Sequence, residues 1–258
     1  MAKQTYALVT GASSGIGKAF ARELAKRGYN LIIVARRQEL LLALANELKQ
    51  TFGVDVLTQS IDLSLPTAAK TVFDFVVAQQ ADVEVLVNNA GIGMHGKMLQ
   101  QDLEGITKML HLNMVTLTQL TFLFGKQMAQ KKKGYILQVS SVGAFQPSPN
   151  YAAYAATKAY VMLLGEALDE ELKNTGVHVT TLYPGATVSE FFDVANQQLN
   201  PFLKRRLIAA ETVAAKGLDG LFAGKRSVLN GIVNNIMVAS VKFMPRKLAT
   251  RIAGWVMK

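Results

Sequence analysis

The chain alternates between short apolar runs and longer stretches in which apolar positions recur every three or four residues. The short runs have strand length and are nearly continuous in Val, Ile, Leu and Ala, which is typical of strands covered on both faces. The longer stretches have the period of amphipathic helices. Strands are expected at Tyr6–Thr10, Leu31–Ala35, Val54–Ser60, Val83–Val87, Tyr135–Ser140 and His178–Leu182, and helices at Gly15–Arg27, Gln38–Thr51, Thr67–Gln80, Leu103–Lys131 and Tyr151–Lys173.

This order of elements predicts an α/β fold, a Rossmann-type doubly wound parallel sheet flanked by helices. Residues 231–258 are expected to form a C-terminal helical extension. No linker rich in Pro, Gly or Ser divides the 258 residues, so a single domain over residues 1–258 is expected. Ligands of such folds bind beyond the carboxyl ends of the strands.

Composition narrows the chemistry that the chain can perform. There is no cysteine, which excludes disulfides and thiolate chemistry, and the three histidines are scattered, so no metal site is expected. Met1–Thr5 leads directly into an apolar strand, which leaves no room for a signal peptide and predicts a cytoplasmic location. The apolar stretch Val228–Val241 is too short to span a membrane.

The net charge of +10 is concentrated at the C-terminal end of the chain. Residues 201–258 contain 11 Lys and Arg against 2 Asp and Glu. Such a basic end indicates an anionic neighbour, which could be a membrane surface, a partner or an acidic substrate. Nucleic acid is not expected, because no nucleic-acid-binding motif accompanies the charge.

A glycine-rich turn between the first strand and the first helix predicts a nucleotide site. Gly11, Gly15 and Gly17 let the backbone approach a pyrophosphate, and the following helix directs free N–H groups at it. Arg36 and Arg37 end the second strand, where an NAD-selective site would carry an acid. Their forked donors suit a 2′-phosphate, which favours NADP(H) over NAD(H), although exposed arginines also occur as plain surface charges.

Further motifs follow in the expected order. Asn88-Asn89-Ala90-Gly91 comes after the fourth strand, Ser140-Ser141 ends the fifth, and Tyr183-Pro184-Gly185 follows the sixth. Tyr154 and Lys158 are four residues apart, so they share one helix face and can reach one ligand. An ammonium beside a tyrosine is expected to lower the pKa of the phenol.

Over Thr5–Ser189 these motifs resemble the short-chain dehydrogenase/reductase family, in its NADP-preferring branch, and are similar to uncharacterised bacterial short-chain oxidoreductases. The resemblance implies hydride transfer between NADP(H) and a carbonyl or secondary alcohol. Tyr154 would act as the acid/base, with Lys158, Ser141 as the substrate-orienting serine, and Asn113 holding a relay water. The implied cofactor-binding residues are Gly11, Ser13, Ser14, Gly15, Ile16, Gly17, Arg36, Arg37, Asp62, Asn88, Ala90, Gly91, Tyr154, Lys158, Pro184, Gly185, Thr187 and Ser189.

Residues 190–212 are expected to form a lid over the substrate, and their composition predicts a lipophilic substrate. Lys204, Arg205 and Arg206 could add a rim for an anionic tail such as that of an acyl-CoA. The apolar lid positions are Phe191, Phe192, Val194, Leu199, Phe202, Leu203, Leu207 and Ile208.

The C-terminal extension admits two interpretations. Ile232, Ile236, Met237, Val241 and Met244 are expected to form one helical face. That face either packs on the catalytic body or a second subunit, or rests on anionic lipid as a basic amphipathic helix. A homo-oligomer is expected from the alanine-rich helix 151–173, which permits close helix packing.

Two other functions remain open at this stage. The same fold could serve as a non-catalytic NADP(H) sensor or scaffold, although such a protein would not need the tyrosine, lysine and serine together. A sugar-nucleotide epimerase or dehydratase would typically be longer and have a different glycine spacing. His95 could face the substrate, but a loop histidine with no such role is the simpler interpretation.

Overall fold

The computed structural model describes residues 5–199 and 201–257, so Met1–Gln4 and Lys258 of the stretches discussed above lie outside it. The described chain forms a seven-stranded sheet in the order β3-β2-β1-β4-β5-β6-β7, and every neighbouring pair is parallel. The expected fold is confirmed. The strands are β1 Thr5–Thr10, β2 Asn30–Ala35, β3 Val56–Ser60, β4 Asp82–Asn88, β5 Gly134–Val139, β6 Val177–Tyr183 and β7 Ser227–Leu229.

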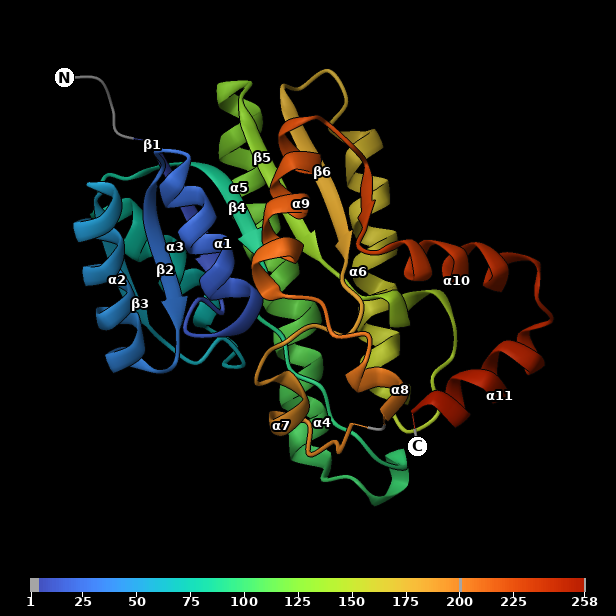
Figure 1. Ribbon diagram of the computed structural model, residues 1–258. Coiled ribbons are helices and arrows are strands. Elements are labelled where there is room, and N and C mark those ends of the chain that lie inside the picture. Colours follow the sequence, from blue (N-terminus) through green and yellow to red (C-terminus); the bar gives the residue numbers. More distant parts are fainter. Residues whose placement is uncertain (1–4, 200, 258) are drawn as a thin grey trace.

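Helices cover both faces of the sheet (Figure 1). On one face α1 (Gly15–Lys26), α2 (Gln38–Phe52) and α9 (Ala210–Phe222) pack in one apolar cluster. On the other, α3 (Ala68–Ala78) and α5 (Leu117–Lys131) pack in a second cluster beside α6 (Ala152–Glu171). Alternate residues of each strand enter alternate clusters, Val9 the first and Leu8 the second, so the strands are apolar throughout.

The strand order reverses between β1 and β4, and the loops at the carboxyl ends of these strands flank the reversal point. The strand arrows in Figure 1 point downward to this edge of the sheet, where the short helices α7 (Phe191–Val194) and α8 (Pro201–Lys204) also lie. Two 3-10 turns, η1 (Met98–Gln100) and η3 (Val142–Phe145), complete the connections.

The expected helix Leu103–Lys131 is wrong in one respect, because it is not α-helical throughout. It consists of α4 (Leu103–Leu110), a π-helical segment η2 (His111–Thr116) and α5. The π-helical turn contains Asn113, whose amide is fully buried and bonds to groups outside the helix. π-Helical turns inside α-helices are frequent at functional sites.

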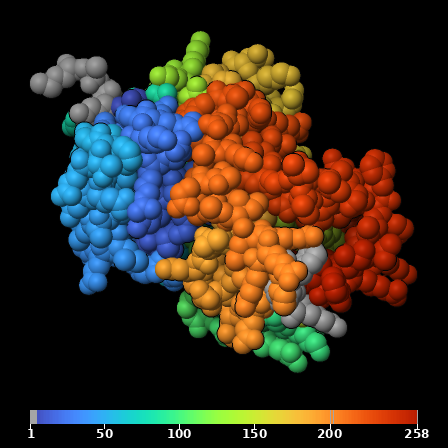
Figure 2. Space-filling model, viewed as in Figure 1, coloured from blue at the N-terminus to red at the C-terminus, as the bar shows by residue number. Residues whose placement is uncertain are grey.

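The C-terminal extension is α10 (Ile232–Phe243) and α11 (Arg246–Val256), joined at Pro245. In Figure 1 the two helices form an arm beside the rest of the molecule, and Figure 2 shows it in red next to the orange segment near residues 190–212. Among the residues that the structure describes, no helix combines the length and hydropathy needed to cross a bilayer.

Candidate active site

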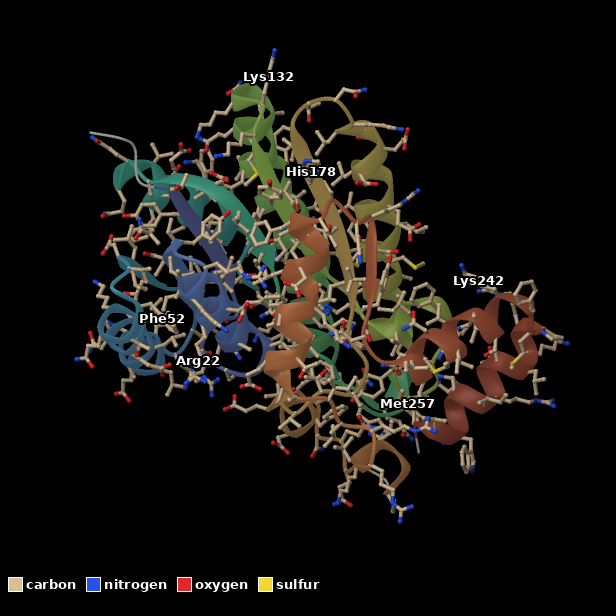
Figure 3. All side chains as sticks on the ribbon, turned by 45° about the horizontal axis from the view of Figure 1, so that its top comes forward. Arg22, Phe52, Lys132, His178, Lys242 and Met257 are labelled. Atoms are coloured by element: carbon tan, nitrogen blue, oxygen red, sulfur yellow. The ribbon has the colours of Figure 1, made fainter. Side chains whose placement is uncertain are left out.

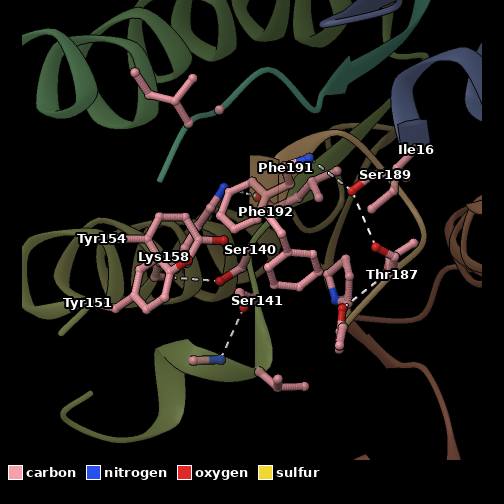
Figure 4. Close-up of a pocket in the computed structure, with 18 of the residues that line it drawn as sticks. Ile16, Ser140, Ser141, Tyr151, Tyr154, Lys158, Thr187, Ser189, Phe191 and Phe192 are labelled. Atoms are coloured by element: carbon pink, nitrogen blue, oxygen red, sulfur yellow. Dashed lines mark hydrogen bonds between the residues drawn. The ribbon is translucent and has the colours of Figure 1, made fainter. Parts of the chain in front are cut away.

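A pocket of about 580 Å³ opens at the carboxyl edge of the sheet. Its walls come from the loops after β1, β2, β3, β4, β5 and β6, from α6, and from the two C-terminal helices. One end is built of glycines and polar groups and the other of apolar side chains, and Figure 4 shows some of the residues that line the pocket.

The polar end contains the glycine turn. Gly11 and Gly15 have φ of +69° and +52°, a backbone conformation that side chains disfavour. A Cβ on Gly17 would lie 2.1 Å from the carbonyl oxygen of Gly11, so the turn can close only with glycine there. No side chain caps the N-terminus of α1, which leaves its N–H groups available to an anion. Ser13, Ser14 and Ile16 complete this wall.

Arg36 and Arg37 border the same end of the pocket, and both are exposed. The Arg37 guanidinium donates to Ser13 Oγ at 3.2 Å and to a carboxylate oxygen of Glu190 at 2.7 Å. Arg37 therefore links the start of segment 190–212, at Glu190, to the glycine turn, at Ser13. The hydrogen bond from Arg37 also holds the pKa of Glu190 below its usual value.

Asp62 lies next to Arg36 at this wall of the pocket. Its carboxylate accepts from the backbone N–H of Ser64 at 2.9 Å and from the Ser64 hydroxyl at 2.8 Å. Burial acts to raise the pKa of Asp62, but these hydrogen bonds and Arg36 outweigh it, so the pKa lies below its usual value. The side chain is therefore a fixed anion that can accept from a ligand amine.

Ser141, Tyr154 and Lys158 meet at the middle of the pocket (Figure 4). Ser141 follows β5, and its Oγ accepts from the N–H of Gly143 at 3.1 Å while it bonds to the Tyr154 hydroxyl. Lys158 is 4% exposed and donates to the carbonyl oxygen of Val139 at 2.9 Å. Its Nζ lies 5.8 Å from the centre of the Tyr154 ring.

The expected lowering of the tyrosine pKa is not found. Burial raises the pKa of Tyr154 to about 12, and the hydrogen bond with Ser141 offsets only part of that rise. Burial likewise lowers the pKa of Lys158 to about 8. The ammonium bonds to Val139 and faces the ring instead of the phenol oxygen, so desolvation dominates both groups.

Asn113 does not line the pocket but supports it from behind. Its amide donates to the Ile92 carbonyl at 2.9 Å and to Thr157 Oγ1 at 3.0 Å, and its oxygen accepts from the Ile92 N–H at 3.0 Å. A Cβ on Gly91 would meet Asn113 Oδ1 at 3.2 Å and Lys158 Nζ at 3.3 Å. Asn113 therefore holds the loop after β4 against the lysine, and the relay water stays a prediction.

The loop after β6 brings Pro184, Gly185, Thr187 and Ser189 to the pocket, and Ser189 lies against Gly15 of the glycine turn. Thr187 Oγ1 donates to the Gly185 carbonyl at 2.9 Å, which fixes the turn.

The model of the short chain dehydrogenase family matches residues 5–200. The chain belongs to this family. It is accordingly an oxidoreductase that interconverts C=O and CH–OH groups.

Known relatives agree with this assignment. A very-long-chain 3-oxoacyl-CoA reductase of Mus musculus is 30% identical over 248 residues, which are 93% of this chain and 76% of the relative. Further reductases of that name match over only 52–65% of their own length, so they extend well beyond the shared region.

Solved structures show the same fold. A short-chain dehydrogenase from Sphingobium yanoikuyae in complex with NADPH is 29% identical, with a TM-score of 0.82 over 94% of this chain and 97% of its own. A 7beta-hydroxysteroid dehydrogenase is also 29% identical, with a TM-score of 0.87 over 96% of each chain.

In this short-chain dehydrogenase, one expected cofactor residue does not reach the pocket. Asn88 points into the protein, where it donates to Thr121 Oγ1 at 2.9 Å and to Gln138 Oε1 at 3.2 Å. Its neighbour Asn89 lines the pocket instead, together with Ala90 and Gly91. Because β4 ends at Asn88, the last residue of the strand faces the core and the first loop residue lines the pocket.

The apolar end of the dehydrogenase pocket agrees with the lid prediction in part. Phe191, Phe192, Val194 and Leu203 line it, whereas Leu199, Leu207 and Ile208 do not, and the Phe202 side chain lies outside the described residues. Ile208 packs on the core instead. Of the three expected basic rim residues only Arg206 borders the pocket.

Several lining residues were missed by the sequence analysis. The Tyr151 ring packs 5.5 Å from that of Tyr154, and its hydroxyl donates to Gln197 at 2.7 Å. The C-terminal helices add a wall of apolar side chains. In the sequence, only the four-residue spacing of Met237 and Val241 indicated that α10 turns an apolar face inward. This wall consists of Met237, Val241, Met244, Ala249, Ile252, Ala253, Val256 and Met257.

The expected single face of α10 is therefore wrong. Met237, Val241 and Met244 face the pocket, but Ile232 and Ile236 lie on the other side of the helix and are 80% and 65% exposed. His95 has a structural role, because its Nε2 lies 2.8 Å from the carbonyl oxygen of Met257 and helps anchor the end of the chain.

Proposed function

We propose that this short-chain dehydrogenase uses NADP(H) to interconvert a carbonyl and a secondary alcohol on a lipophilic substrate, with Tyr154 as the acid/base. The observation that carries the proposal is the position of Ser141, Tyr154 and Lys158. They meet between a glycine-lined end bordered by two arginines and an end lined by apolar side chains.

The residues of the polar end suit NADP(H). Gly11, Gly15 and Gly17 leave room for a pyrophosphate at the N-terminus of α1, and Arg36 and Arg37 supply donors for a 2′-phosphate. Asp62 would accept from the adenine amine, and Ala90, Gly91, Pro184, Gly185, Thr187 and Ser189 would border the rest of the cofactor. When bound, the nicotinamide supplies or accepts the hydride. The solved Sphingobium relative with NADPH supports this assignment.

The proton chemistry belongs to the protein. With its pKa raised to about 12, Tyr154 is protonated at neutral pH and can donate to a carbonyl oxygen as reduction proceeds. Ser141 can donate to the same oxygen and hold it beside the phenol. The buried Lys158 ammonium would stabilise the tyrosinate left behind, and Asn113 would position the loop that faces the lysine.

The apolar end supports a lipophilic substrate. Phe191 packs 5.2 Å from the Tyr154 ring, so a carbonyl that reaches the tyrosine must lie against aromatic side chains. The relatives named for 3-oxoacyl-CoA and hydroxysteroid substrates have lipophilic substrates, which agrees with such a pocket. Residues 190–212 would act as the lid of a single catalytic domain, and Arg206 would face an anionic substrate tail.

The dehydrogenase is also proposed to be a homo-oligomer. The outer side of α6 is exposed at Ala152, Ala156 and Leu163, which share one face by their four- and seven-residue spacing. Small side chains on that face would allow a second helix to approach closely.

The test is to follow NADPH and NADH absorbance with long-chain 3-oxoacyl thioesters, ketosteroids and small sugars. Tyr154→Phe should abolish turnover and leave NADPH binding intact, because only the hydroxyl is lost. Tyr160→Phe is the matched control, since Tyr160 lies on the same helix and bonds to Thr118 outside the pocket. Full activity of Tyr154→Phe would refute the mechanism, and better turnover of sugars would refute the substrate class. Tight NADPH binding without turnover on any substrate would favour the sensor alternative.

A further inference from the structure

The C-terminal arm, defined as α10 and α11, carries a second apolar face that the pocket does not use. On α10, Ile232, Ile236 and Phe243 recur at four- and seven-residue spacing and therefore form one stripe. They are 80%, 65% and 90% exposed, and none of them lines the pocket. On α11, Leu248 and Trp255 are seven residues apart and are also exposed.

Exposed cations lie on the same arm. Lys242, Arg246, Lys247 and Arg251 are all exposed, and Figure 3 shows Lys242 pointing away from the body of the molecule. No Asp or Glu occurs in the sequence after Asp219. Within residues 5–199 and 201–257, none of these four cations has a carboxylate at salt-bridge distance.

Burying this face against a second copy of the chain would be opposed by its own charge. A symmetric dimer brings the same patch of both subunits together, so four cations would meet four cations with no acid between them. An anionic bilayer offers the complementary chemistry, with headgroups for Lys and Arg and an apolar boundary for Phe, Ile and Trp.

We propose that the outer face of the C-terminal arm docks on anionic lipid bilayers, with the Ile232–Ile236–Phe243 stripe inserted at the headgroup boundary. The inner face of the same arm, at Met237, Val241 and Met244, forms a wall of the pocket. The arm therefore separates the bilayer from the apolar end of the pocket by the thickness of one helix. A lipophilic substrate dissolved in the bilayer would enter beside this wall, a step that rests on the function proposed above.

The chain provides its own probe of docking, because Trp255 is its only tryptophan and lies on the arm. Its fluorescence is measured with phosphatidylcholine vesicles, with and without phosphatidylserine, and with brominated lipids as quenchers. Docking predicts a blue shift and quenching that require phosphatidylserine and weaken as salt is added. No turnover is needed for this readout, so docking and the proposed activity can fail separately.

Variants separate the contributions of charge and apolar contact. Lys242→Gln with Arg246→Gln should lower the vesicle partition coefficient roughly thirtyfold, since each cation near an anionic surface contributes about 1 kcal/mol. Lys126→Gln with Lys216→Gln removes the same charge elsewhere and should change partitioning far less. Phe243→Ser should weaken binding, whereas Leu99→Ser, at a position 98% exposed on η1, should not. Unchanged NADPH binding shows that each variant is folded.

Two results would overturn the proposal. One is the absence of any fluorescence change with phosphatidylserine vesicles. The other is self-association that Phe243→Ser abolishes while vesicles have no effect, which would make the face an interface between copies of this chain.

Discussion

At the scale of single residues, the active centre contains a charge that the fold disfavours. Lys158 is 4% exposed, and burial lowers its pKa to about 8 from an ordinary value of 10.5. Below pH 8 the folded protein must keep a buried ammonium, and the Val139 carbonyl is its hydrogen-bond acceptor. The fold therefore loses stability by keeping the charge that the proposed mechanism uses.

Lys158→Met should therefore stabilise the protein while it abolishes turnover. The free energy of unfolding should rise by at most about 3 kcal/mol at pH 7. The gain is reduced because the Val139 carbonyl loses its hydrogen-bond donor. Because the folded pKa is the lower one, wild-type stability rises between pH 8 and pH 10.5, and the difference should shrink over that range. Denaturant unfolding of the wild type and the variant across this pH range measures the difference in stability. A variant less stable than wild type at pH 7 would contradict the expectation.

A second residue-scale prediction concerns Glu190. Its carboxylate forms an ion pair with the Arg37 guanidinium and would compete with a 2′-phosphate for that group. Glu190→Gln should tighten NADPH binding severalfold and leave NADH binding unchanged, because the ion pair is exposed and weak. Isothermal titration with both cofactors provides the measurement. Asp193→Asn, three residues away and outside the pocket, is the matched control, and equal effects on NADPH and NADH would show that Arg37 does not contact the 2′-phosphate.

The four-residue spacing of Tyr154 and Lys158 predicts that they share one helix face, and both line the pocket, whereas their roles come from the resemblance to the family. Asn88 and Asn89 could not be told apart in this way. Which of two neighbouring amides faces the ligand depends on where β4 ends and on the partners Thr121 and Gln138, which come from distant parts of the chain.

At the scale of elements, the position of α6 matters because it carries both Tyr154 and Lys158. Gly165 lets this helix approach β6, and a Cβ there would lie 2.1 Å from Thr181 Oγ1. Hydrophobic periodicity predicted helical structure over residues 103–131, but not the π-helical turn around Asn113 that separates α4 from α5. One widened turn hardly changes the spacing of apolar residues over 103–131, so the pattern does not reveal it. The turn is stabilised by hydrogen bonds from Asn113 to Ile92 and Thr157, which are distant in sequence.

Gly165→Ala should destabilise the protein by about 1–3 kcal/mol, because the extra methyl group overpacks the contact between helix and sheet. It should also lower kcat, since any displacement of α6 moves the phenol and the lysine together. Thermal unfolding and steady-state kinetics test both effects. Ala167→Ser, at an exposed position two residues further along the same helix, should change neither stability nor kcat. If Gly165→Ala also changed neither, α6 would tolerate the displacement and the prediction would be wrong.

At the scale of the whole molecule, the C-terminal extension is part of the pocket and not an appendage. Met257 and Gly254 contact the loops that precede Tyr154, through His95 and Pro149. Sequence alone could not orient α10, because Ile232–Ile236 and Met237–Val241 are both four-residue apolar pairs. Only the packing of the arm against the Pro184–Gly185 turn, where Gly185 meets Asn234, determines which pair faces inward.

The last prediction concerns the number of subunits. Phe122 on α5 and Leu163 on α6 are 65% and 64% exposed, and each lies about one turn beyond the Thr118–Tyr160 hydrogen bond that holds the helices together. Leu163→Arg should convert the proposed oligomer to a monomer, because two buried guanidiniums would face each other across a two-fold interface. Light scattering after size exclusion measures the mass. Val77→Arg places the same charge at a half-exposed site on α3 and should leave the mass unchanged. The prediction would be contradicted if the wild type were a monomer or if Leu163→Arg remained an oligomer. Either result would show that α5 and α6 do not form the interface.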